Sequence, residues 1–209
     1  MWLYIYPLIY FITISVGFVY YHKFKQDVAL MFFLGFLIYS FFTEVIGNYC
    51  GRILGINTFY IYNLWHIVNH LFYMIFFLYL MKGTFKGNLL KWLLVIYIII
   101  VSIDIIFIEN FITQGLINIM IIGSLFVVIS VMLFFIELIN RDEILEIQKT
   151  LVFWIAIGVL LFNIGFIPII IIAEFIAYRG IFSYIILTLN IIMSFCFITG
   201  FIVSKKECN

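Results

Sequence analysis

Seven long runs of apolar residues, separated by short polar connections, fill the chain almost from end to end. Most runs are close to the ~20 residues that an α-helix needs to cross a bilayer. They are continuous and lack the two-residue alternation of a membrane β-barrel. The pattern therefore predicts an all-α integral membrane bundle of seven transmembrane helices, forming a single domain over residues 1–209. The predicted spans are 2–21, 28–47, 59–81, 92–108, 115–139, 150–173 and 181–203.

Lysine and arginine fall on every second connection between these runs. Two of the eleven, Arg52 and Arg179, lie on one side of the predicted bundle. The other nine lie on the opposite side: Lys23, Lys25, Lys82, Lys86, Lys91, Arg141, Lys149, Lys205 and Lys206. Because Lys and Arg are concentrated in short cytoplasmic loops, the pattern predicts an N-terminus outside the cell and a C-terminus in the cytoplasm.

The composition agrees with a chain that lies almost wholly in lipid. Hydrophobic residues make up 67% of the 209 positions and charged residues only 10%, whereas a soluble domain is about a quarter charged. We expect the first span to be permanent, since no basic segment or small-residue cleavage site marks a signal peptide. The net charge of +1 provides no basic surface for nucleic acid.

Polar residues inside the predicted spans are the candidates for function, because such residues are costly in a bilayer. Asn63, His66 and His70 are spaced three and four apart, which places them on one face of a helix. With the predicted orientation, polar residues of four other spans fall in the same outer half of the bundle. The sequence therefore predicts a pocket for a small molecule or a lipid headgroup. Its predicted lining is Glu44, Asn63, His66, His70, Asp104, Asn163 and Asn190.

Two other interpretations of these polar residues stay open. They can serve only as hydrogen bonds between helices. Alternatively, His66 and His70 have the i, i+4 spacing of two metal ligands, with Glu44 or Asp104 as a third. That interpretation predicts a metal-dependent intramembrane hydrolase acting on lipids, although no glutamate stands between the histidines as it does in zincins.

Several enzyme and cofactor classes lack their sequence signals. No lysine lies within a predicted span, so a retinal Schiff base has no attachment point. The chain contains no GxSxG, GxxxxGK[ST] or GxGxxG motif. Its three cysteines have no paired spacing that would indicate a zinc site or a disulfide framework. We therefore expect a protein without enzymatic output and make no positive cofactor prediction.

The connection after the fifth span is the most highly charged. Glu137 and Arg141 form an i, i+4 pair in the favourable order, and Asp142 and Glu143 follow. This segment is either an ordinary helical hairpin at the interface or a docking surface for a cytoplasmic or membrane partner. In the second case Arg141, Asp142 and Glu143 are the predicted contact residues.

Several segments resemble a family of small seven-helix membrane proteins from Gram-negative bacteria with AT-rich genomes. The centre of the resemblance is Phe153-Trp154-Ile155 with Gly158 and the following Leu160-Leu161-Phe162. The other segments are 44–47, 61–63, 135–140, 165–168, 196–201 and 204–206. The resemblance implies a seven-helix fold and a bacterial origin but no particular activity.

These observations favour a receptor-like or sensory module of a bacterial inner membrane. The expected ligand enters the outer half, and the signal passes to a partner through the cytoplasmic connections. The alternatives are the metal-dependent lipid hydrolase and an accessory membrane subunit of a signalling or defence operon.

Overall fold

The computed structural model describes residues 5–140, 144–175 and 179–205. Within this part the chain forms seven α-helices and two short 3₁₀ helices, with no strand. The α-helices are α1 (Ile5–Val19), α2 (Val28–Arg52), α3 (Phe59–Leu80), α4 (Phe85–Phe107), α5 (Ile117–Ile139), α6 (Leu151–Phe175) and α7 (Arg179–Val203). The short helices are η2 (Tyr21–Lys23) and η3 (Ile144–Lys149).

Each predicted span coincides with one of these helices, so the all-α fold is confirmed. Six helices in the described part are long and apolar enough to cross a membrane, whereas α1 is shorter, with 15 described residues. The protein is therefore a helical bundle of the multi-pass membrane type. The seventh crossing and the direction of insertion remain predictions.

Two helix boundaries differ from the predicted spans. Helix α2 continues beyond residue 47 as far as Arg52, and α4 begins at Phe85 instead of residue 92. Thr84 explains the early start, because its backbone is extended and its hydroxyl accepts a hydrogen bond from the Gly87 amide at 3.0 Å. Lys86 and Lys91 consequently lie inside the first turns of α4, where the sequence pattern predicts a connection.

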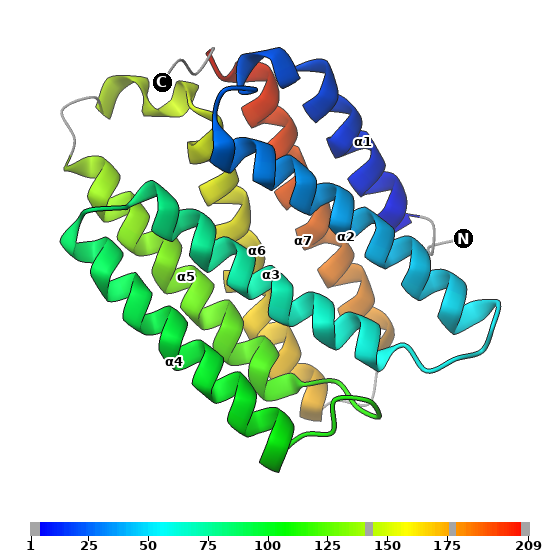
Figure 1. The fold of residues 1–209 in the computed structure, drawn as a ribbon. Coiled ribbons are helices and arrows are strands. Elements are labelled where there is room, and N and C mark those ends of the chain that lie inside the picture. The colour runs from blue at the N-terminus through cyan, green and yellow to red at the C-terminus, as the bar shows by residue number, and fades with distance from the viewer. Residues whose placement is uncertain (1–4, 141–143, 176–178, 206–209) are drawn as a thin grey trace.

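Six of the helices contact one another in a closed ring, and α4 lies outside it at the edge of the bundle (Figure 1). Helices α1, α2, α3, α5, α6 and α7 pack in that order, and α7 returns to α1. Helix α4 packs on the outside against α3 and α5. Only 17% of the most apolar part of α4 is buried, compared with 39–44% for the other long helices. Helix α4 therefore has the largest surface available to lipid.

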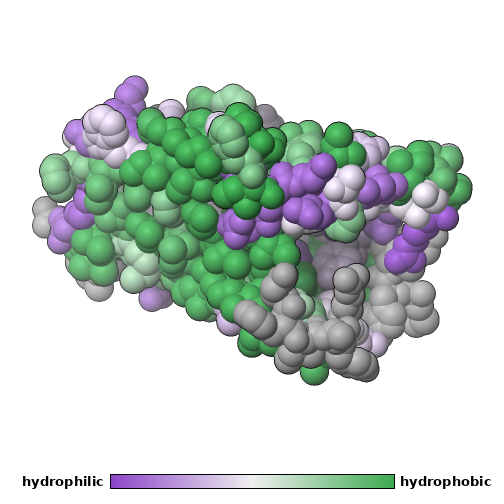
Figure 2. Space-filling model, turned by 90° about the horizontal axis from the view of Figure 1, so that it is seen from below, coloured by the Kyte–Doolittle hydropathy of each residue, from purple (hydrophilic) through white to green (hydrophobic). Residues whose placement is uncertain are grey.

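Hydrogen bonds identify the two ends of the bundle. At the lysine-rich end, which carries the α1–α2, α3–α4 and α5–α6 connections, the Lys23 ammonium donates to the carbonyls of Phe201, Ile202 and Ser204. At the lysine-poor end, which carries the α2–α3 and α4–α5 connections, Asn57 donates to the Ile112 carbonyl at 3.0 Å. In the view from below, apolar side chains cover most of the described surface, and hydrophilic residues gather mainly from the middle to the right of the view (Figure 2).

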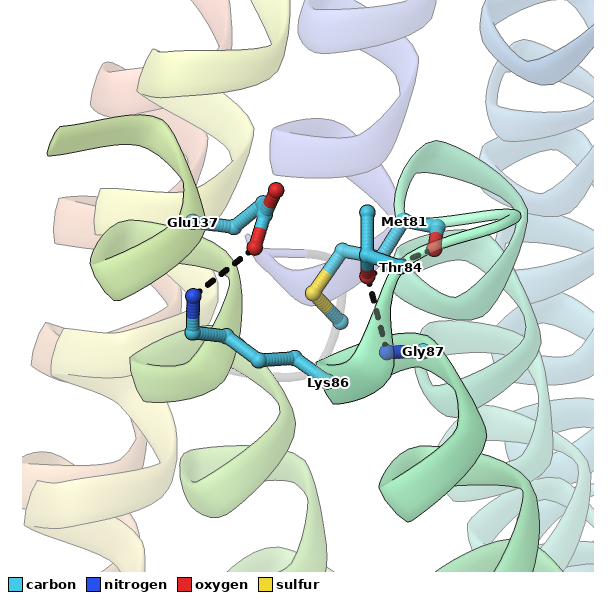
Figure 3. Close-up of polar contacts among 5 residues, drawn as sticks. All are labelled: Met81, Thr84, Lys86, Gly87 and Glu137. Atoms are coloured by element: carbon cyan, nitrogen blue, oxygen red, sulfur yellow. Dashed lines mark hydrogen bonds and ion pairs between the residues drawn. The ribbon is translucent and has the colours of Figure 1, made fainter. Parts of the chain in front are cut away.

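An ion pair joins α4 and α5 at the lysine-rich end. The Lys86 ammonium lies 2.8 Å from a carboxylate oxygen of Glu137, and both side chains are partly exposed. Figure 3 shows this pair beside the Thr84 cap, so the turn that begins α4 also positions its lysine toward α5. The position of Glu137 is thus explained by a partner on α4, in addition to the pairing with Arg141 that the sequence predicts.

Candidate functional site

Asn63, at the start of the polar face of α3, holds the α4–α5 connection. Its amide nitrogen donates to the carbonyls of Phe111 and Gln114, both at 2.8 Å. Its amide oxygen accepts from the Leu116 backbone amide at 3.1 Å. The side chain is 1% exposed. Both ends of the amide are therefore engaged, and Asn63 positions the connection that leads into α5.

His70 lies at the centre of a buried polar chain that links three helices. Its Nδ1 is 3.0 Å from the Tyr97 hydroxyl of α4, and its Nε2 is 3.4 Å from the Ser124 hydroxyl of α5. A neutral imidazole has one donor and one acceptor nitrogen, so one neighbour donates to the ring and the other accepts from it. Ser124 is 0% exposed, which leaves no access for a substrate and favours a bridge between helices over a nucleophile.

Gly123 makes this arrangement sterically feasible. A Cβ atom at this position would lie 2.6 Å from two carbons of the His70 ring, which is well inside van der Waals contact. The imidazole therefore rests directly on the backbone of α5. Small residues allow such close approach between membrane helices.

His66 differs from the other residues of the stripe, because it is only half-buried and makes no hydrogen bond within the described part of the chain. Its ring stacks on Phe166 of α6 with centroids 6.0 Å apart and lies 6.2 Å from the His70 ring. Its ring nitrogens thus keep their hydrogen-bonding capacity beside α6.

Asp104 and Glu109 form a carboxyl pair at the lysine-poor end. One oxygen of Asp104 accepts from the Asn118 side chain at 3.2 Å, and its other oxygen is buried without a hydrogen-bond partner among the described residues. One carboxyl oxygen of Glu109 is likewise buried without a hydrogen-bond partner among the described residues. Desolvation, followed by the neighbouring Asp104 carboxyl, raises the pKa of Glu109 to about 7. Glu109 therefore gains or loses its proton near neutral pH.

Glu44 belongs to a separate contact between α2 and α3. Its carboxylate accepts from the Tyr62 hydroxyl and from the Asn48 side chain, both at 3.3 Å. Gly47 provides the space, since a Cβ there would lie 2.6 Å from the Tyr62 hydroxyl. Glu44 thus joins two helices instead of meeting the histidines.

Asn163 and Asn190 lie on α6 and α7, and each donates to a carbonyl of its own helix. The buried amide oxygen of Asn163 has no partner. Asn190 lines a cavity of about 10 Å³ together with residues such as Thr13 and Ser194, which hydrogen-bond to each other. That volume holds about one water molecule and no larger ligand.

The predicted site is therefore divided into several groups. Asn63, His70 and Asp104 gather on the α3–α4–α5 side, while Glu44 and Asn190 lie in other contacts. Among the described residues, no three His, Cys, Asp or Glu side chains form a group that could hold a metal ion. The proposed set of His66, His70 and Glu44 is thus not assembled in this structure. The predicted partner contacts Arg141, Asp142 and Glu143 lie outside the described residues.

Several residues that form these contacts are not among the polar residues that the sequence predicts to line the site. Tyr97 and Ser124 are the partners of His70, and Glu109 is a carboxyl whose pKa the nearby Asp104 raises. Tyr97 and Ser124 are single residues in apolar runs, and only the adjacent Gly123-Ser124 pair signals a close approach. Glu109 lies just beyond the predicted end of its span and is therefore easily assigned to solvent.

Comparisons with known proteins give no match to a family model, to a curated protein or to a solved structure. The resemblance to small bacterial seven-helix proteins accordingly stays a prediction. The membrane-type helical bundle rests on the chain's own composition and fold.

Proposed function

We propose that the protein is a receptor-like or sensory module of a bacterial inner membrane in which α5 carries the signal. The observation that supports this proposal is that α5 takes part in polar contacts at three levels along its length. Its beginning is held by Asn63 and, through Asn118, by Asp104. Further along the helix Ser124 meets His70, and near its end Glu137 meets Lys86.

These contacts connect the two ends of the bundle through one helix. In the predicted orientation the lysine-poor end faces outward and the lysine-rich end faces the cytoplasm. A shift of α5 at its outer end would alter the His70–Ser124 contact and the Lys86–Glu137 pair. Beyond Glu137 the chain leads into η3, so a cytoplasmic or membrane partner that docks there would sense the movement.

The proposed ligand is a small molecule or lipid headgroup that enters at the lysine-poor end. Three of the predicted residues keep unused polar atoms: the ring nitrogens of His66, one oxygen of Asp104 and the amide oxygen of Asn163. Buried polar atoms without partners are unfavourable, so a ligand that satisfied them would stabilise the conformation to which it binds. Asn63, in contrast, is saturated by protein contacts, and we assign it to positioning.

The test is to release α5 at one end and measure the response at the other. In Asn63→Ala protein in lipid nanodiscs, we expect amide hydrogen exchange of residues 144–149 to change, because α5 loses its hold on the 111–116 segment. Exchange in residues 21–27, at the same end of the bundle but not connected to α5 by these bonds, is expected to stay at the wild-type rate.

Thr13→Ala is the matched control. It removes a buried contact between α1 and α7 that does not involve α5, and it should leave exchange in residues 144–149 unchanged. If residues 144–149 of the Asn63→Ala protein exchange at the same rate as in the wild type, the proposed role of α5 is contradicted. Equal changes in both variants would show a general loosening of the bundle and would contradict it as well.

A further inference from the structure

An apolar groove of about 270 Å³ runs between the first turns of α2 and the last turns of α3. It lies at the lysine-rich end, opposite the proposed ligand site. It is lined by Val28, Ala29, Phe32, Phe72, Ile75, Phe76 and Tyr79. No charged side chain takes part in this lining.

The shape of the groove results from one small residue between large ones. Ala29 and Phe76 are buried at 6% and 4% exposure, whereas Phe32 and Ile75 are exposed at 69% and 52%. The exposed side chains thus form the walls and the buried ones form the floor. Because the groove opens outward from the hydrophobic length of two membrane-type helices, hydrocarbon chains are its expected neighbours, and we exclude an aqueous solute.

Two lysines lie close in sequence to the residues that line this groove. Lys25 precedes the lining residue Val28 by three positions, and Lys82 follows Tyr79 by three. Both side chains are exposed, and neither forms an ion pair with a carboxylate in the described part of the chain. The nearby Asp27 carboxylate caps α2 by accepting from the Leu30 amide at 3.0 Å, so it is already engaged by the helix.

We propose that this groove binds one acyl chain of an anionic phospholipid whose phosphate contacts Lys25 and Lys82. Basic residues next to a groove between membrane helices attract anionic headgroups, and an ammonium group binds phosphate as a compact point charge. The hydrocarbon chain would fill the space above Ala29 between Phe32 and Ile75. The site is independent of the proposed signalling function, since it involves neither α5 nor the polar residues of the lysine-poor end.

The first experiment measures lipid selectivity. Wild-type protein is reconstituted in bilayers of equal phosphatidylglycerol and phosphatidylcholine, extracted in mild detergent, and its retained lipids are quantified by native mass spectrometry. We expect phosphatidylglycerol to be enriched. In the Lys25→Gln/Lys82→Gln variant, each substitution should lower the enrichment of phosphatidylglycerol by about fivefold. Lys91→Gln is the control, since Lys91 lies on α4 at the same end and bonds to Asn88.

The second experiment fills the groove. Ala29→Phe should lower retention of both lipids, because its ring occupies the space of the acyl chain. Val95→Phe, which adds the same bulk to a lipid-facing position of α4 exposed at 45%, should not. Phe32→Ala removes an exposed wall without disturbing the core and should lower retention even if Ala29→Phe fails to fold. Equal retention of the two lipids by wild-type protein, or wild-type retention in both the double-lysine and Phe32→Ala variants, would overturn the proposal.

Discussion

The lysine-rich and lysine-poor halves of the bundle are stabilised by different interactions. In the lysine-rich half, buried aromatic rings pack against one another, and Phe33 contacts Phe76, Phe197 and Phe201 at centroid distances of 5.0–6.4 Å. In the lysine-poor half, buried side chains such as Asn63 and His70 make directional hydrogen bonds. Lipid supplies little hydrophobic driving force between helices, so the first half depends on close packing. The second depends on a few specific bonds that also position its connections.

The largest expected effect tests the aromatic half. Phe33→Ala removes a ring that is 0% exposed and lies among three other rings. We expect a loss of about 3–5 kcal/mol in the free energy of unfolding, measured by reversible unfolding in mixed micelles. Phe195→Ala is the control, because Phe195 is exposed at 67%. Similar losses in both variants would show that packing in this half is not specific.

The next effect concerns the close approach of α3 and α5. Gly123→Ala places a methyl group against the His70 ring, and we expect a loss of about 1–3 kcal/mol from overpacking. Gly35→Ala is matched to it, since nothing lies within 4 Å of a Cβ at that helical position. The control should remain within about 1 kcal/mol of wild type or gain stability. A neutral Gly123 variant would contradict the direct contact between the imidazole and α5.

Asn63→Ala tests the hydrogen bonds of the lysine-poor half. It removes three bonds to the 111–116 segment. At about 0.6 kcal/mol for each bond in a membrane protein, the expected loss is about 2 kcal/mol. The Asn163→Ala variant should be close to neutral, because Asn163 donates only within its own helix and its oxygen is unpaired. The same unfolding assay measures both variants. Equal losses of stability would show that Asn63, which holds a connection, contributes no more than Asn163, whose amide oxygen has no partner.

The smallest effect is a pH dependence at the lysine-poor end. The pKa of Glu109 rises from 4.5 to about 7 on folding, so between these values the folded state binds the proton more tightly than the unfolded state. Stability contributed by this group is complete below pH 4.5 and is lost as the pH rises through about 7. We expect Glu109→Gln to reduce the decrease in melting temperature between pH 5 and 8, whereas Glu137→Gln, at the other end, should retain it. An identical slope in wild-type and Glu109→Gln protein would contradict the raised pKa of Glu109.

The sequence predicts the helices well and the site only in part. Apolar runs place every helix because each run must span the same hydrocarbon thickness. Spacing on one helix also places Asn63, His66 and His70 on a common face. The spacing along one helix cannot predict which neighbour each residue contacts. That depends on the order in which the helices pack in the ring and on the position of α4 outside it. His70 therefore meets Tyr97 and Ser124, whereas the predicted metal partner Glu44 binds Tyr62.

The hydrogen bonds of Lys23 have a consequence for the biosynthesis of the protein. Its ammonium donates to three carbonyls at the end of α7. A lysine that is translated early therefore forms its hydrogen bonds with residues that are translated much later. Until α7 has been translated, Lys23 lacks these three carbonyl partners. The ring is closed only after translation of the final helix. Variants of Lys23 should therefore reduce the yield of newly made protein more than they affect the protein once assembled.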